Sequence, residues 1–329
     1  MTMPIVRRAL LALAAAAVFQ AGTATAQDYP NRPITIVVPL AAGSGMDTLV
    51  RLYADKLQGA LGQPVVVENR PGASLMLAAA TVAKAPADGY TLLVSTSSAM
   101  AINPVLYKSI NYNPVKDFVP ISFYVKSPMI LVVNPDLPAK SVPELIKLAK
   151  EGGKPLTYSS PGAGVAQHLS MEYMKKRFAL DITHVPYKNT PQSVSDIAAG
   201  HVNLGFAEAG ASLPLIRDGK LRALAVSANS RIPSLPEVPP FSEAANAPDF
   251  EAVSWHMLFA PAGTPPAIVE RLHAEMKKIM ADPEMIKMTE KIGLIPVQSP
   301  DIKGIETYLA SERDKWGGLV KQIGLEGTM

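Results

Sequence analysis

Cysteine is absent from the 329 residues, and histidine occurs only five times. The lack of cysteine excludes disulfides, thiolate metal sites, iron–sulfur clusters and a cysteine nucleophile, and five scattered histidines leave few ligands for a transition metal. Charge of one sign is also scarce, because the net charge is +3 with 18% charged residues, too little for a nucleic-acid-binding surface. With 48% hydrophobic residues, the composition is that of an ordinary globular protein, and the length suits two domains.

Residues 1–26 have the pattern of a secretory signal peptide. Arg7 and Arg8 form a basic region, residues 9–19 are apolar, and Ala24 to Ala26 supply the small residues that precede a cleavage site. The apolar stretch is much shorter than the roughly 20 residues needed to span a bilayer, and no later segment has 18 uninterrupted apolar residues. We therefore expect cleavage after Ala26 and an exported mature protein, which in a Gram-negative cell means the periplasm.

From residue 31 onward, β-rich runs alternate with helical patterns. Strands are expected at 34–38, 65–67, 90–94, 120–124, 130–133, 156–159, 182–185 and 250–260, and helices at 47–61, 75–84, from 142 on, 166–177, 266–280, 283–292 and 302–323. Such alternation indicates parallel β-sheet covered by helices. The expected division is a signal peptide at 1–26, a first lobe at 27–126 plus 253–329, and a second lobe at 127–252, which ends in a proline-rich ordered loop at 232–248.

Four strand-to-helix junctions are rich in small residues. They are Val38 to Asp47, Asn69 to Ser74, Ser95 to Ser98, and Ser159 to Gly164. In parallel α/β sheets such junctions lie at the carboxyl ends of the strands, where ligands bind. The first turn of the following helix offers unpaired N–H groups and the positive end of the helix dipole. Turn geometry alone explains any one of these loops, but four of them favour an anion site in a cleft between two lobes.

These junctions supply candidate ligand contacts with little charge. The candidates are Ala42, Gly43, Ser44, Met46 and Asp47 in the first junction, Ser74 in the second, Thr96 and Ser97 in the third, Gly162, Ala163 and Gly164 in the fourth, and His168 just after it. Arg70 is the only cation within the four loops, so the site suits a small carboxylate better than a polyphosphate. There is no P-loop motif, and the Gly162 loop lacks the third glycine of GxGxxG. We therefore expect no nucleotide or other cofactor.

Ser44 raises a catalytic alternative. It lies on a strand-to-helix turn, as a hydrolase nucleophile would, but the spacing is not GxSxG and nothing in the sequence marks a partner histidine and acid. A serine lining a tight turn is the simpler interpretation, and nothing in the sequence requires an enzyme. A periplasmic serine hydrolase remains the remote alternative.

Short motifs in a fixed order resemble one family. They are Pro33 to Pro39 with Ala42, Gly43 and Asp47, then Val65 to Ala73, Asp88 to Leu93, Ile102 to Pro104, Pro114 to Phe118, Val185 to Lys188, Gly219 to Val226, and Leu258 to Pro265. Together they resemble the Bug family, the periplasmic solute-binding components of tripartite tricarboxylate transporters. The resemblance covers essentially all of the mature chain.

The resemblance implies an α/β, two-lobed periplasmic-binding-protein fold (Venus-flytrap, type II) with a ligand cleft between the lobes. Such a protein closes on a small organic acid and hands it to membrane permease subunits. Family ligands include dicarboxylates, tricarboxylates, amino acids and aromatic acids. By the resemblance, one ligand carboxylate is held by first-lobe loops at Ala42 to Asp47 and at Ser74-Leu75, and the rest is covered by Gly162 to Gly164, Lys188, Asn189, Thr190, Phe206, Ala207 and Glu208.

The chain departs from the family pattern at two places. Where relatives have glycines after Pro-Gly-Ala, it has Ser74 and Leu75, and where many have Trp-Tyr-Gly it has Trp255, His256 and Met257. His256 thereby joins the candidate ligand contacts. If Leu75 and Met76 face the cleft, the ligand has a hydrophobic body, for example an aromatic mono- or dicarboxylate. If both are core residues of the second helix, an aliphatic di- or tricarboxylate fits equally well.

The role of the closed form is also open at this point. It could deliver its ligand to a transporter or signal to a membrane kinase, because the mature sequence would look the same in either case. In both cases we expect a monomer whose partners are a small organic acid and membrane subunits, with no nucleic acid.

Overall fold

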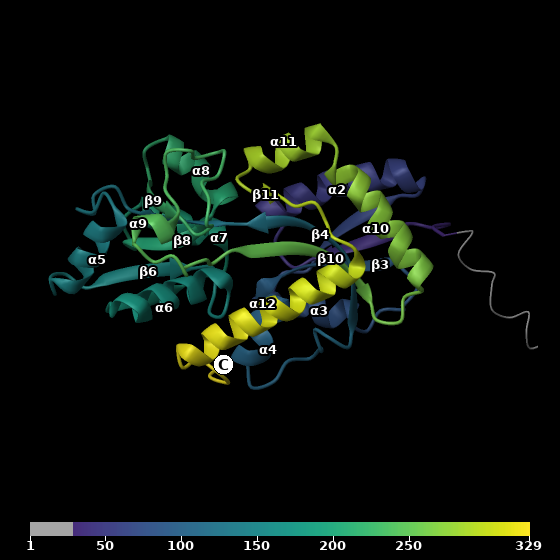
Figure 1. The fold of residues 1–329 in the computed structure, drawn as a ribbon, viewed down its shortest axis with the longest axis horizontal. Helices are drawn as coiled ribbons and strands as arrows, with labels where there is room; N and C mark the ends of the chain where they lie inside the picture. Colours follow the sequence, from purple (N-terminus) through teal and green to yellow (C-terminus); the bar gives the residue numbers. More distant parts are fainter. Residues whose placement is uncertain (1–28) are drawn as a thin grey trace, which may run out of the picture.

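The computed structural model describes residues 29–329, so the expected signal peptide lies outside the described residues. Two separate β-sheets lie end to end along the molecule (Figure 1). One sheet has six strands in the order β11-β4-β10-β3-β1-β2, and the other has five in the order β7-β6-β8-β5-β9. The elements around the six-stranded sheet form the first lobe, and those around the five-stranded sheet form the second lobe.

The first lobe is built from both ends of the described chain. Its strands are β1 (Ile34–Val38), β2 (Val65–Asn69), β3 (Thr91–Thr96), β4 (Phe118–Ser127), β10 (Ser254–Pro261) and β11 (Ile295–Pro296). Its helices are α2 (Gly45–Leu61), α3 (Met76–Val82), α4 (Asn103–Leu106), α10 (Pro266–Met280), α11 (Pro283–Lys291) and α12 (Ile302–Gln322), with a 3-10 turn η1 (Ala73–Leu75) and a π-helical turn η2 (Ser98–Ile102).

The second lobe is built from the middle of the chain. Its strands are β5 (Met129–Val133), β6 (Leu156–Ser160), β7 (Ile182–Pro186), β8 (Leu204–Glu208) and β9 (Arg222–Val226). Its helices are α5 (Val142–Lys150), α6 (Ala166–Phe178), α7 (Thr190–Ala198), α8 (Ala209–Arg217) and α9 (Phe241–Ala244), the last of which lies within the proline-rich stretch. The sequence analysis missed α7, β8, α8 and β9, and it began β10 four residues too early.

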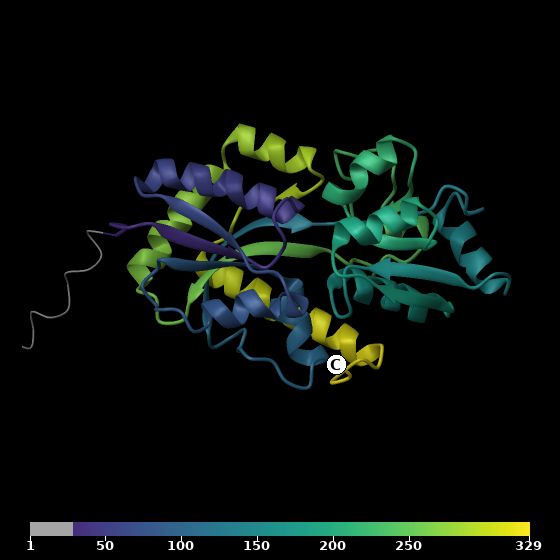
Figure 2. The same cartoon turned by 180° about the vertical axis from the view of Figure 1, so that it is seen from behind.

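The sheets are mixed rather than parallel throughout, which corrects the expectation. Strands β1, β2 and β3 are parallel, but β10 runs antiparallel to both β3 and β4, and β5 runs antiparallel to β8 and β9. The cause is the path of the chain, because β4 and β5 lead from the first sheet to the second and β10 leads back. Outgoing and returning strands must point in opposite directions, as the view from behind shows (Figure 2).

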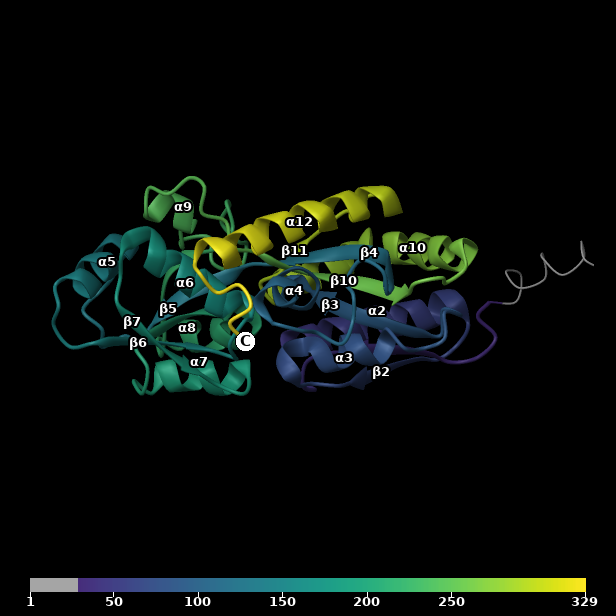
Figure 3. The same cartoon turned by 90° about the horizontal axis from the view of Figure 1, so that it is seen from below.

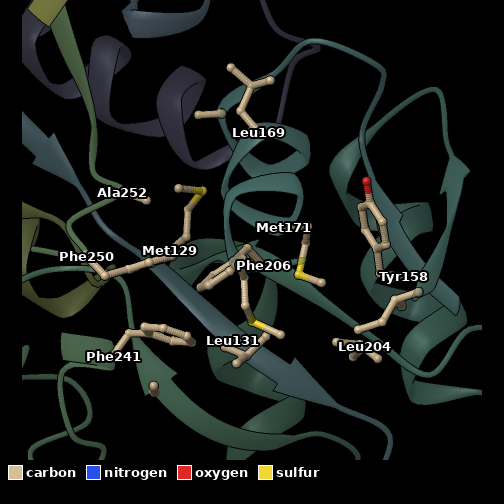
Figure 4. Packing of buried hydrophobic residues seen from close by; sticks show 14 of the residues in the cluster. Met129, Leu131, Tyr158, Leu169, Met171, Leu204, Phe206, Phe241, Phe250 and Ala252 are labelled. Atoms are coloured by element: carbon tan, nitrogen blue, oxygen red, sulfur yellow. The ribbon is translucent and has the colours of Figure 1, made fainter. Parts of the chain in front are cut away.

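Each sheet is covered by helices on both faces. In the first lobe, α2 and α10 pack on one face, and α3 with the first half of α12 packs on the other. In the second lobe, α5, α6 and α9 cover one face, and α7 and α8 cover the other. Figure 4 shows the first of these second-lobe faces, where Phe206, Phe241 and Phe250 pack around Leu131 and Met129. This arrangement leaves the carboxyl ends of the parallel strands uncovered by helix, where a ligand can reach them.

Helix α12 contacts both lobes, as the view from below shows (Figure 3). Ile305 and Leu309 pack in the first lobe beside Trp255, whereas Trp316 packs with second-lobe residues. The indole N–H groups of Trp255 and Trp316 both donate to Oε2 of Glu312, each at 2.9 Å. Glu312 is buried, so this one carboxylate ties the returning strand β10 to the helix that spans the lobes.

We expect Glu312→Ala to lower the free energy of unfolding by about 3 kcal/mol, because it leaves two buried indole donors without an acceptor. Glu306→Ala on the same helix is the matched control, since Glu306 is exposed, and it should cost less than about 0.5 kcal/mol. Urea denaturation of the two variants measures the difference. Equal stabilities would show that Glu312 is not a structural tie.

Candidate ligand-binding site

A cavity of about 680 Å³ lies between the two lobes, within the range of roughly 300–1,000 Å³ usual for ligand pockets. Both lobes contribute to its wall, and residues of the crossing strands β4, β5 and β10 close it where the chain passes between the sheets. The lining residues are Pro39 to Ser44, Pro71 to Leu75, Thr96, Ser98, Ser127, Met129, Pro161, Gly162, Val165 to Gln167, Tyr187 to Pro191, Glu208, Ser254 and His256. All four junctions therefore reach one cavity.

The first junction is shaped by the N-terminus of α2. Ser44 caps this helix, and its Oγ accepts a hydrogen bond from the backbone N–H of Asp47 at 3.2 Å. Ser44 lines the cavity together with Ala42 and Gly43. The first-turn amides of α2 have no partner within the helix, so this wall presents a partial positive charge without a cationic side chain.

Asp47 holds this wall from behind. Its carboxylate accepts hydrogen bonds from the Gly43 N–H at 2.9 Å, from Asn69 Nδ2 at 2.8 Å and from Arg51 Nε at 3.1 Å. Burial raises the pKa of Asp47, but the bonds from Arg51, Gly43 and Asn69 outweigh it and keep the pKa below its ordinary value. Asn69 also donates to the Leu40 carbonyl oxygen, so one ionised carboxylate fixes the first two junctions relative to each other.

The second junction adopts an unusual backbone. Ala73, Ser74 and Leu75 have φ values of 46°, 49° and 73°, a left-handed region that favours glycine. The Tyr107 hydroxyl donates to Ser74 Oγ at 2.8 Å, and Asn103 Nδ2 donates to the Ser74 carbonyl oxygen at 2.8 Å. Leu75 and Met76 both pack against the first-lobe core, and only Leu75 also lines the cavity.

Hydrogen bonds join the lobes at this edge of the cavity. Ser74 Oγ donates to the Ala163 carbonyl oxygen at 3.3 Å, and the Ala166 N–H donates to Ser98 Oγ at 3.2 Å. The contact also depends on Gly164, because a Cβ at that position would lie 2.3 Å from Leu106 Cδ2. The second and third junctions therefore meet the fourth through small groups.

The fourth junction is hydrogen-bonded to His168, one of two stacked histidine rings. The rings of His168 and His184 are 4.3 Å apart, and the Gly164 N–H donates to His168 Nδ1 at 3.1 Å. Burial lowers the pKa of His168, and burial with the neighbouring His168 lowers the pKa of His184 to about 4. Both rings are therefore neutral near pH 7, which lets His168 act as the acceptor that orients this loop.

Within residues 29–329, two charged side chains line the cavity, Lys188 and Glu208. Lys188 is exposed at the rim, and Glu208 is half-buried in the wall. Burial raises the pKa of Glu208 above its ordinary value, and a hydrogen bond from Gln167 Nε2 at 3.2 Å offsets only part of this increase. His256 is buried in β10 and also lines the wall.

The structure brings many of the expected contacts together and places others behind the wall. Those that line the cavity are Ala42, Gly43, Ser44, Ser74, Leu75, Thr96, Gly162, Asn189, Thr190, Glu208 and His256. Those outside the lining are Met46, Asp47, Ser97, Ala163, Gly164, His168, Phe206 and Ala207. Strand geometry explains two of the latter, because Phe206 and Ala207 point to opposite faces of the sheet and pack into separate cores, and only the strand end at Glu208 reaches the cavity.

Apart from His256, the sequence analysis missed the part of the wall made by the crossing strands. Ser127, Met129 and Ser254 line the cavity but belong to no strand-to-helix junction. Pairing between β4 and β10 aligns Ser127 with Ser254, and pairing between β5 and β8 aligns Met129 with Glu208. No local pattern marks such positions, although the expected lobe boundaries near 127 and 253 lie close to them.

Among the described residues, the contact made by the Ser44 side chain is that of a helix cap. The side-chain partner of Ser44 is the backbone N–H of Asp47, not an imidazole. In the part of the chain that the structure describes, no three His, Asp or Glu side chains gather where they could hold a metal ion. No helix between residues 29 and 329 is both long and apolar enough to cross a bilayer.

His256 should make stability depend on pH. Its Nδ1 has no hydrogen-bond partner among the described residues, and burial lowers its pKa to about 4. The unfolded chain, with a pKa of about 6.5, takes up this proton first as the pH falls, so stability is lost between about pH 6.5 and 4. We expect His256→Phe to reduce the loss of unfolding free energy between pH 7.5 and 4.5 by about 2.5 kcal/mol.

The control for this experiment is His201→Gln, which changes a histidine whose side chain is 70% exposed. Denaturant melts at the two pH values should show the same loss for this control as for the parent protein. If His256→Phe loses as much unfolding free energy between pH 7.5 and 4.5 as the parent protein does, burial of a neutral His256 does not set the pH dependence.

Comparison with known proteins accounts for this architecture. The profile of the "Tripartite tricarboxylate transporter family receptor" matches residues 49–325. BugT of Bordetella pertussis is 35% identical over 306 residues, which cover 92% of this chain and 93% of BugT. Rpa4515 of R. palustris, solved with adipate, has a TM-score of 0.85 and 35% identity, covering 90% of this chain and 99% of that one.

A second solved structure has the same fold. MatC of Rhodopseudomonas palustris, with bound malate, has a TM-score of 0.81 and 29% identity, covering 89% of this chain and 100% of that one. These similarities confirm both the resemblance seen in the motifs and the two-lobed binding-protein fold. The chain belongs to the family of tripartite tricarboxylate transporter receptors, the Bug-type solute-binding proteins.

Proposed function

We propose that the exported protein binds a small organic carboxylate with a hydrophobic body and delivers it, as a monomer in the periplasm, to membrane permease subunits of a tripartite transporter. The proposed lobes are residues 27–126 plus 253–329 and residues 127–252, and they close on the ligand. The observation that carries this proposal is the cavity, which both lobes line with small residues and helix N-termini. Two relatives solved with adipate and malate support an acidic ligand.

The hydrophobic body rests on the composition of the wall. Pro39, Leu40, Leu75, Met129 and Val165 all line the cavity. Apolar wall of this kind gains free energy when it loses water to an apolar ligand, at roughly 25 cal/mol per Å². A flexible, strongly hydrated triacid gains little from such a wall, whereas an aromatic acid can cover it.

Calorimetric titration combined with small-angle scattering tests this function. Benzoate, terephthalate, adipate, malate and citrate form a suitable panel, and the aromatic acids should give the strongest heats together with a smaller radius of gyration. A preference for citrate would contradict the hydrophobic body. Flat heats and unchanged scattering across the panel would contradict the function itself.

Closure can be tested where the lobes approach each other. A Cβ at Gly210, in α8, would lie 3.6 Å from the Cα of Gly45, in α2. We expect Gly210→Leu to weaken acid binding at least tenfold and to suppress the contraction in scattering, because the larger side chain holds the lobes apart. Binding depends on closure, so the two effects must appear together.

The matched control for closure is Gly59→Leu, another exposed helical glycine with no heavy atom within 4 Å of its Cβ position. It should bind as the parent protein does. Normal affinity in Gly210→Leu would show that the lobes need not approach at this point.

Leu75 provides a test of the hydrophobic body. We expect Leu75→Asn to weaken binding of an aromatic acid roughly tenfold, because it removes apolar surface from the wall, while asparagine tolerates the left-handed backbone. Leu77→Asn is the control, since Leu77 is 49% exposed and lies outside the lining. Equal affinities for the two variants in calorimetry would show that Leu75 does not touch the ligand.

A further inference from the structure

Glu208 is a carboxyl group at the surface of a cavity that otherwise suits anions. It is the last residue of β8 and precedes the first turn of α8, yet its side chain makes no capping bond to that helix. Its hydrogen-bond partner among the described residues is Gln167 Nε2, which also lines the cavity. An ionised carboxylate offers about four acceptor sites, so most of the acceptor capacity of Glu208 is left for a ligand.

The surroundings of Glu208 make a second carboxylate there unfavourable. Burial raises the pKa of Glu208, and two carboxylates that share a site cannot both ionise without a large cost. Lys188, the other charged residue in the wall, makes no ion pair with Glu208 among the described contacts. The strand order β7-β6-β8 puts one strand between the ends of β7 and β8, so the strand ends that carry these charges are roughly 10 Å apart.

A hydrogen-bond donor on the ligand resolves this conflict. An ammonium, amide or hydroxyl group can give Glu208 a second partner besides Gln167, and a donor to a charged acceptor contributes more than a neutral pair. A site that is built to pair with a donor rejects analogues without it, because its own buried polar group is then left unsatisfied.

We propose that Glu208 selects acids that carry, besides a carboxylate, a group able to donate a hydrogen bond, over dicarboxylates that have no such group. The inference rests on the proposed function, since it takes the cavity to be the acid-binding site. It assigns the ligand class: amino, hydroxy or amide acids rather than symmetrical diacids. The first-lobe amides near Ser44 hold the carboxylate, and Glu208 accepts the donor.

Matched pairs of ligands provide the test at pH 7.5. The pairs are adipate against 6-aminohexanoate and adipic monoamide, terephthalate against 4-carbamoylbenzoate, and succinate against malate, all titrated calorimetrically. We expect the donor-bearing member of at least one pair to bind ten or more times as tightly as its diacid. This comparison uses the unaltered protein, so it stands even if a variant does not fold.

Glu208→Gln should reverse the selection. The neutral amide removes the repulsion between Glu208 and the second carboxylate of the ligand. Adipate should therefore bind the variant several times more tightly than it binds the parent protein, while 6-aminohexanoate should bind the variant at least tenfold more weakly. Glu237→Gln is the control, because Glu237 is an exposed second-lobe acid outside the cavity, and it should leave every affinity unchanged.

The outcomes separate this inference from the proposed function. If acids bind but diacids match or exceed their partners, and Glu208→Gln leaves the ranking unchanged, the donor selection is wrong and the receptor function stands. If no acid in any pair binds, the proposed function fails, and the inference fails with it.

Discussion

The binding wall depends on one buried anion, the carboxylate of Asp47. It holds the Gly43 amide, Asn69 and Arg51 together at the N-terminus of α2. These bonds align two loops from neighbouring parallel strands, β1 and β2, so that their small residues form one surface. Because these partners already satisfy the negative charge of Asp47, this carboxylate does not take up the remaining backbone amides around Ser44. Those amides stay available to an anionic ligand. Asp47 therefore shapes the anion site without touching the cavity.

The second constraint on the structure is that the same strands and the same helix connect both lobes. Strands β4 and β10 are paired along the first sheet, and the chain crosses between the lobes at their ends. Helix α12 packs on both sides of this crossing, and Glu312 connects it to β10. Under the proposed closure, motion is confined to the chain segments at this crossing, as in a hinge. The cavity lies beside the crossing, because Ser127, Met129 and Ser254 line it.

The cavity combines neutral dipoles with one acid and one base from the described residues. The first lobe offers helix and loop amides, which attract a carboxylate without a tightly hydrated cation, and the second lobe contributes Glu208 and Lys188. We propose that the polar groups of the second lobe and the apolar surface around Leu75 together define which acid fits.

Local sequence determined much of this protein. The β-branched run at Ile34–Val38 and the serine cap at Ser44 depend on neighbouring residues, and so does the end of α2 at Gly62, which has a left-handed backbone. The small residues of the junctions are also local, and the motifs identified the family. Tertiary structure decided which of the candidate residues face the cavity. Leu75 and Met76 are adjacent and both pack against the first-lobe core, yet only Leu75, which has a left-handed backbone, also lines the cavity. Ser127 and Ser254 meet because β4 and β10, which are distant in sequence, pair in one register. Neither the residues next to these serines nor their spacing along the chain encodes that pairing.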